Sequence, residues 1–171
     1  MAEFTNETID VAALPRFEEV IFTPLHPDYW KVTLISLMIV LAVAAAGLAA
    51  SILLIEDVST RSAEAIIAVV VLFALIFFFS RISFRKKGYA FREHDVLFRS
   101  GIIATNTIII PYNRVQHVAL HEGLLSRSFG LAEIQIFTAG GSSSDIGIPG
   151  IKKEQAENIK QLLMGKIQKQ L

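Results

Sequence analysis

A glycine-rich stretch, GLLSRSFGLAEIQIFTAGG at residues 123–141, is the part of the sequence that most suggests a chemical site. A phosphate-binding loop places its glycines directly before a helix, with a lysine at the phosphate groups. Here Gly140 and Gly141 end an alternating apolar run and lead into another strand instead. We therefore expect sheet architecture, in which a short turn packs Phe129 against the sheet, Gly130 reverses the backbone and the glycine pair forms a hairpin turn.

Histidines and a serine-rich loop are the remaining candidates for catalysis or metal binding. His117 and His121 lie on one face of a predicted strand, about 13 Å apart at about 3.3 Å per residue, which is too far for one metal ion. His26 and His94 lie elsewhere, and the loop at 142–145 has neither a nucleophile elbow nor a nearby base. The chain contains no Cys, which excludes disulfides and thiolate chemistry. We expect no catalytic, cofactor or metal site, and hence a protein that is not an enzyme.

Four basic residues lie close together in the middle of the chain: Arg81, Arg85, Lys86 and Lys87. We call these four the basic cluster. Such a cluster can fix the orientation of a membrane protein, because positive residues are retained in the cytoplasm. It can also contact anionic lipid headgroups, at about 1 kcal/mol per basic residue near the surface. The two roles are compatible, and the cluster is the candidate site for contact with anionic lipid.

The elements around this cluster follow from composition. Hydrophobic residues make up 53% of the 171-residue chain and charged residues only 19%, which points to membrane segments. The run from Val32 to Ile55 has no charged residue, and about 20 apolar residues suffice for a helix to cross a bilayer. A second, shorter run covers residues 65–80, and the polar connection between the runs is short. The two runs therefore predict a transmembrane helical hairpin.

The distribution of Lys and Arg predicts the orientation of this hairpin. The connection holds only Arg61, whereas Arg16, Lys31 and the basic cluster flank the outer ends of the two spans. Both termini should therefore face the cytoplasm. Tyr29 and Trp30 stand where an aromatic belt would anchor the first span. Neither span contains an ionisable residue, which argues against a transporter or pump.

The second half of the chain alternates between apolar and polar residues in short runs, which is typical of a β sandwich or barrel. In one run, Ile134, Ile136 and Thr138 should face inward. The predicted strands number six or seven, in runs at residues 88–93, 95–101, 106–115, 116–123, 132–138 and 144–150.

The last segment changes to helical spacing. Ala156, Ile159, Leu163 and Ile167 form an apolar stripe with Leu162 beside them, which predicts an amphipathic helix across an open edge or end of the sheet. The chain thus divides into an N-terminal segment at 1–31, a hairpin at 32–80 with its connection at 56–64, a basic linker at 81–87 and a small β domain with its closing helix at 88–171.

Residues 110–163 contain an Ile-Pro step, an Arg-x-Gln pair, a Gly-x-Leu-x-Arg-x-x-Gly turn and a strand that ends in Thr-Ala-Gly. In these motifs the segment resembles the bacterial pleckstrin-homology (PH) domain of YdbS-like membrane proteins. We call the matching residues the family positions: Ile110, Pro111, Arg114, Gln116, Gly123, Leu125, Arg127, Gly130, Thr138, Ala139 and Gly140. One departure is Lys152, where the family often has a Ser or Thr to cap the last helix.

The resemblance implies a two-span protein of the bacterial inner (plasma) membrane that carries a PH-like domain in the cytoplasm. It also implies a non-enzymatic interaction or assembly module, whose partner would be a larger membrane protein with several PH-like domains. An exposed sheet edge could bind this partner by strand addition. The competing hypothesis is lipid binding or handling through the basic cluster.

Other partners follow from charge. The formal net charge is +0, so no global field attracts nucleic acid, and we expect no nucleic-acid partner. The bilayer itself is an expected partner, and a homo-oligomer is left open.

Overall fold

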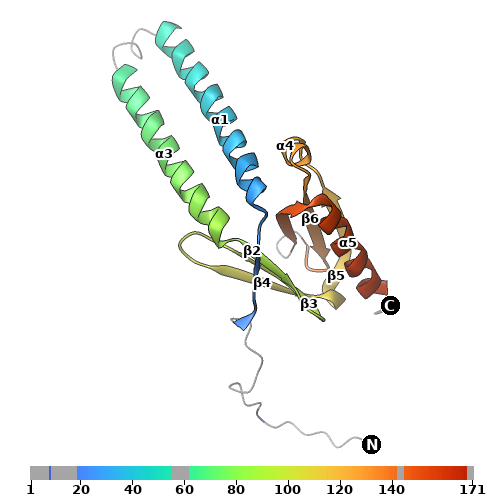
Figure 1. The fold of residues 1–171 in the computed structure, drawn as a ribbon. Coiled ribbons are helices and arrows are strands. Elements are labelled where there is room, and N and C mark those ends of the chain that lie inside the picture. Colours follow the sequence, from blue (N-terminus) through green and yellow to red (C-terminus); the bar gives the residue numbers. More distant parts are fainter. Residues whose placement is uncertain (1–7, 9–18, 55–61, 142–144, 169–171) are drawn as a thin grey trace, which may run out of the picture.

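The computed structural model describes residues 8, 19–54, 62–141 and 145–168. Arg16, Arg61 and Ser142–Ser144, as well as most of the predicted connection, lie outside this range. The described chain forms a long helical hairpin beside a small domain of two antiparallel sheets, which confirms the predicted fold class (Figure 1).

The hairpin consists of helices α1 (Pro27–Leu54) and α3 (Ser62–Lys86), which lie side by side (Figure 1). Pro27 suits the first helical position, and Asp28 in the first turn favours the helix dipole. Both helices are long and apolar enough to cross a membrane, and 0% of the most apolar stretch of either helix is buried within the chain. Lipid must cover this surface, because water would not solvate two such apolar helices.

The observed helices extend beyond the predicted spans. Helix α1 begins at Pro27 rather than at Val32, and α3 continues to Lys86. Residues 81–86, which the sequence suggested as a linker, are therefore the last turns of α3. Arg85 and Lys86 in the final turn are stabilised by the negative end of the helix dipole.

Two sheets make up the β domain. The first has the strand order β1-β2-β3-β4 and the second the order β5-β6-β7, and all their pairings are antiparallel. The strands of the first sheet are β1 (Thr23–Pro24), β2 (Gly88–Phe91), β3 (Asp95–Ser100) and β4 (Asn106–Pro111). The second sheet contains β5 (Val115–His121), β6 (Leu131–Thr138) and β7 (Ile146–Lys152). The short helix η3 (Tyr112–Arg114) joins the sheets, α4 (Leu124–Ser128) joins β5 to β6, and α5 (Lys153–Gln168) ends the described chain.

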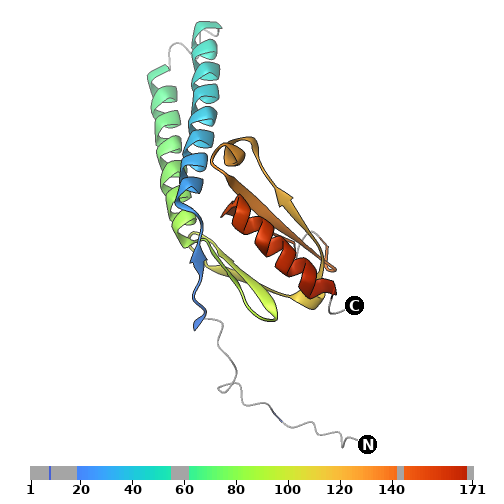
Figure 2. The same ribbon diagram turned by 45° about the vertical axis from the view of Figure 1, so that its right-hand side comes forward.

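The core follows the alternation read from the sequence. Ile134, Ile136 and Thr138 of β6 are buried, as predicted. Helix α5 contacts all three strands of the second sheet and also η3 (Figure 2). Its Ala156 and Leu163 belong to one core cluster with residues of both sheets. The helix therefore closes a core that the two sheets share.

The structure adds two details to the predicted elements. Leu162, beside the apolar stripe of α5 in sequence, is 48% exposed and does not join the core. The short turn expected before Phe129 is the five-residue helix α4, and Phe129 is half-buried. Gly130 does reverse the backbone, with φ of +64°.

Strand β1 was not foreseen. Thr23 pairs with Tyr89 and Pro24 with Gly88, so the chain that precedes α1 joins the sheet that follows α3. The next residue, Leu25, is 3% exposed and is part of the core. The β domain is thus completed by residues from the N-terminal segment.

Candidate functional site at the membrane boundary

The hairpin is attached to the β domain by close backbone packing. The backbone N–H of His26 donates a 2.8 Å hydrogen bond to the carbonyl oxygen of Gly150, at the bend in β7. Gly150 has φ of +68°, and a Cβ there would lie only 2.7 Å from Cγ of Tyr29. The first turn of α1 therefore rests directly on the β7 backbone.

A second attachment involves the end of α3. The indole of Trp30 packs against Phe77 and Phe84, with 5.7 Å between ring centroids in each pair. Nζ of Lys86 donates a 2.6 Å hydrogen bond to the carbonyl oxygen of Ile102, in the loop between β3 and β4. The aromatic residues expected at the bilayer surface thus also join the two helices.

The structure divides the basic cluster. Arg81 and Arg85, one helical turn apart, line the same cavity, and the Arg81 guanidinium lies 4.7 Å from the centre of the Trp30 ring. Lys86 points to Ile102, and Lys87 lines a different cavity. The cluster is therefore not a single patch, because neighbouring residues on a helix point in different directions.

The cavity that Arg81 and Arg85 share, which we call the junction pocket, lies between the ends of the hairpin and the β domain. Its volume is about 600 Å³. The titratable side chains and the tryptophan that line it are His26, Trp30, Arg81, Arg85, Tyr89 and Lys152.

The electrostatics of the junction pocket favour an anion. No carboxylate is among its lining residues, and no described Asp or Glu forms a salt bridge with Arg81, Arg85 or Lys152. Burial raises the pKa of the Tyr89 hydroxyl, although a hydrogen bond with Gln155 acts in the opposite direction. Tyr89 is therefore neutral at physiological pH and brings no negative charge into the pocket.

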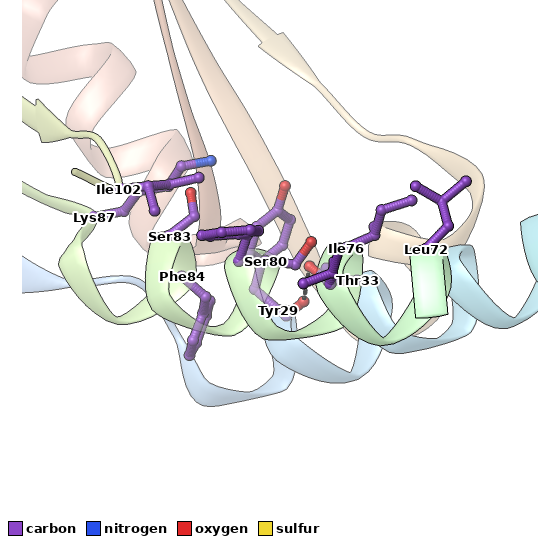
Figure 3. Close-up of a pocket in the computed structure, with 11 residues that line it drawn as sticks. Tyr29, Thr33, Leu72, Ile76, Ser80, Ser83, Phe84, Lys87 and Ile102 are labelled. Atoms are coloured by element: carbon purple, nitrogen blue, oxygen red, sulfur yellow. Dashed lines mark hydrogen bonds between the residues drawn. The ribbon is translucent and has the colours of Figure 1, made fainter. Parts of the chain in front are cut away.

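A second cavity, the helix groove, follows the surface of the hairpin (Figure 3). Its volume is about 560 Å³. Lys87 and Ile102 lie at one end and Leu72 at the other, with the Ser80 hydroxyl between them (Figure 3). A groove that is apolar along the span and basic at its end suits an acyl chain better than a reacting substrate.

A third cavity, the seam pocket of about 290 Å³, lies where β4 meets the end of β6. Five family positions line it together with Ile109: Ile110, Pro111, Arg114, Thr138 and Gly140. The Arg114 carbonyl oxygen accepts a 3.1 Å hydrogen bond from the Ala139 N–H. The Thr138 N–H donates to Oδ1 of Asp145 at 2.8 Å. These family positions therefore line the seam beside β4, and their hydrogen bonds close the end of the second sheet.

The other family positions lie apart from the seam and shape local turns. The Gly123 carbonyl oxygen accepts a hydrogen bond from the Arg127 N–H at 2.8 Å, and that of Gly130 accepts one from the Lys153 N–H at 2.9 Å. Leu125 is half-buried on α4, and Gln116 is exposed on β5 at an irregularity in the pairing with β6.

His117 and His26 each contact neighbouring residues of the domain. His117 stacks on Phe137 with 4.2 Å between ring centroids. Nδ1 of His26 accepts a hydrogen bond from the Asp28 N–H at 3.3 Å. Among the residues that the structure describes, no three His, Asp or Glu side chains come close enough to hold a metal ion.

Sequence reasoning missed that His26 and Lys152 join the two arginines. The two residues come from opposite ends of the chain, and only the pairing of β1 and the docking of α1 on β7 bring them together. Lys152 stood out in the sequence as a departure from the family pattern, which was the one available signal.

Comparison with known proteins agrees with this architecture. A family model described as "Bacterial PH domain" matches residues 12–167. Over 85 residues the chain is 31% identical to "UPF0699 transmembrane protein YdbS" of Bacillus subtilis (strain 168), a match that covers 50% of this chain and 52% of that protein. Over 101 residues it is 31% identical to "UPF0699 transmembrane protein YdbT" of the same organism, covering 58% of this chain and 20% of that protein.

The matches therefore span about half of the first relative and a fifth of the second. No solved structure matches the chain. The family model covers both the hairpin and the β domain, so the resemblance read from the family positions is confirmed. The chain belongs to the bacterial PH domain family.

Proposed function

We propose that this transmembrane protein is a non-enzymatic assembly module, which binds another membrane protein with PH-like domains. The observation that carries the proposal is the free edge of β4 beside the seam pocket. We further propose that it lies in the bacterial inner membrane with its β domain in the cytoplasm.

Strand β4 is the outer strand of the first sheet and pairs with β3 alone among the described strands. An edge strand has backbone N–H and C=O groups that can pair with a strand of another chain. Ile109 on this strand is 39% exposed and borders the seam pocket, which could take an apolar side chain of the partner. Backbone pairing and apolar contact depend only weakly on salt, so we expect assembly to survive high ionic strength.

The relatives support a partner of the same family. The chain is similar both to a protein of about twice its matched length and to a much longer one, each named a transmembrane protein, in the same organism. A homologous domain is expected to have the same strand order, and it would then also present a free edge strand that can pair with β4. A longer family member is therefore the partner that the proposal specifies.

The test compares two exposed apolar residues on different surfaces. Ile109→Lys places a charge at the free edge of β4, and Leu162→Lys places the same charge on α5, where the side chain is 48% exposed. Full-length variants would be purified from their native membranes, and co-purifying membrane proteins with PH-like domains would be quantified by mass spectrometry. We expect Ile109→Lys to lose such a partner by about tenfold, which corresponds to about 1.4 kcal/mol, and Leu162→Lys to retain it.

A photo-crosslinking amino acid at position 109 identifies the occupant directly. An adduct with a longer PH-domain membrane protein would support the proposal. Adducts only with other copies of this chain would replace it with homo-oligomerisation. Equal recovery of the partner with both lysine variants would exclude the β4 edge as the binding surface.

A further inference from the structure

We propose that the junction pocket binds the phosphate-bearing headgroup of an anionic membrane phospholipid. This site is built from β1, β2, β7 and the cytoplasmic ends of the hairpin, whereas the proposed assembly surface is on β4. Each proposal can therefore be tested and rejected without affecting the other.

The positive charge of the pocket comes from three residues on two separate elements. Arg81 and Arg85 lie one turn apart on α3, and Lys152 ends β7. Guanidinium groups bind phosphate through paired, charge-assisted hydrogen bonds, and an ammonium adds a compact positive charge. Asp28 and Glu154 each adjoin a lining residue in sequence, but neither lines the pocket. The Asp28 carboxylate lies 2.6 Å from Nζ of Lys31 and 3.5 Å from Nδ1 of His26. Arg81 and Arg85 are therefore available to an anionic ligand, and Lys152 adds its charge although it also lines a neighbouring cavity with Asp28, Glu154 and Glu157.

The position of the pocket identifies the source of the phosphate. Trp30 lines the pocket and precedes the uncharged part of α1 by two residues, so it lies at the level of the lipid headgroups. Phe84 and Leu25 supply apolar wall beside the cations. A soluble phosphate ester would need the cations but not an apolar wall at the level of the headgroups. A lipid uses both, with its phosphate at the arginines and its glycerol and first methylenes against the aromatic rings.

The size and neutral groups of the pocket fit a headgroup. Its volume of about 600 Å³ lies within the usual range for small-molecule sites, roughly 300–1,000 Å³. Tyr89 and Gln155 line it beside Lys152 and offer uncharged hydrogen-bonding groups. Such groups suit the hydroxyls of a glycerol-type headgroup next to the phosphate.

Trp30 makes the binding directly measurable, because it is the single Trp of the chain. The full-length protein would be reconstituted in phosphatidylcholine vesicles that contain increasing fractions of brominated phosphatidylglycerol, a quencher of indole fluorescence. The test variant is Arg85→Gln with Lys152→Gln, which removes two charges from the pocket. The matched control is Lys86→Gln with Lys87→Gln, which removes two charges at the same membrane surface but outside the pocket.

In the wild type and in the control, we expect brominated phosphatidylglycerol to quench Trp30 fluorescence at lower lipid fractions than brominated phosphatidylcholine does. In the test variant this preference should fall by on the order of tenfold, since each basic residue at the surface contributes substantially to anionic lipid binding. Equal loss in both double variants would mean general surface electrostatics and would overturn the site. Equal quenching by the two lipids in the wild type would overturn it as well.

A second arm separates a lipid from a soluble ligand. Glycerol phosphate and short-chain phosphatidylglycerol would each compete with the brominated lipid in detergent micelles. Competition by the lipid alone supports the proposal, and competition by millimolar glycerol phosphate would assign the site to a soluble phosphate ester instead. If the double variant fails to fold, the single Arg85→Gln variant provides the same comparison against Lys86→Gln. Ile109→Lys should bind lipid normally, which keeps this outcome distinct from that of the assembly test.

Discussion

At the scale of single residues, the contact between Gly150 and Tyr29 determines how the β domain meets the membrane hairpin. Gly150 has a backbone conformation that residues with a Cβ rarely adopt, and its Cα faces the Tyr29 ring without room for a methyl group. The neighbouring hydrogen bond from His26 fixes the entry to α1. A change at this one glycine should therefore affect both halves of the molecule.

We predict that Gly150→Ala destabilises the folded domain much more than Gly130→Ala. Gly130 also has positive φ, but a Cβ there would meet nothing within 4 Å. The backbone strain alone costs about 1–2 kcal/mol, and forcing Tyr29 to move adds roughly 1–3 kcal/mol. Thermal unfolding of the detergent-solubilised protein measures the difference, and equal melting temperatures would contradict the contact.

Alternation in the sequence predicted the inward residues of β6, but nothing in it could predict the role of Gly150. The burial of Ile134 and Ile136 can be predicted from the local sequence, because every second residue of a half-buried strand faces the core. The contact between Gly150 and Tyr29 joins residues far apart in the chain, so local sequence does not predict it. A single glycine next to a proline predicts only a turn. The pairing of Arg81 with Arg85 could have been predicted from the sequence, because residues at positions i and i+4 lie on the same face of a helix.

At the scale of elements, β1 shows that the β domain is not continuous in sequence. The strand has only two residues, which is too short to show alternation, so a sequence analysis assigns it to the segment before the membrane. Its pairing with β2 places Leu25 in the core and creates one wall of the junction pocket. The candidate lipid site therefore depends on an element that no local pattern reveals.

We predict that Leu25→Ala destabilises the β domain by about 2–5 kcal/mol, the usual cost of truncating a buried leucine. The matched control is Ile21→Ala, because Ile21 precedes β1 and is 92% exposed, whereas Leu25 is 3% exposed. Hydrogen exchange of β2 amides would report the loss of β1 pairing. A Leu25→Ala protein with the stability of the Ile21→Ala protein would show that the domain folds without the N-terminal segment.

At the scale of the whole molecule, the pairing of β1 with β2 restricts the topology. Strand β1 precedes the first span and β2 follows the second, so their pairing requires both ends of the hairpin to lie on one side of the bilayer. The β domain lies at that end of the hairpin (Figure 1), and the junction pocket is lined by residues of both. Which side this is depends on the positive residues rather than on the fold.

We predict that this side is the cytoplasm. Lys31 and the basic cluster flank the outer ends of the spans, whereas the connection carries Arg61 alone, and positive residues near spans are retained inside. A green fluorescent protein fused after Leu171 should fluoresce, and alkaline phosphatase inserted in the connection at 56–61 should be active, because it folds only outside the cytoplasm. Replacing the basic cluster with Gln and adding four Lys residues to the connection should reduce both signals, since the charge asymmetry is then reversed. Active phosphatase after Leu171 in the unaltered protein would place the β domain outside, and the junction pocket would then face the outer leaflet.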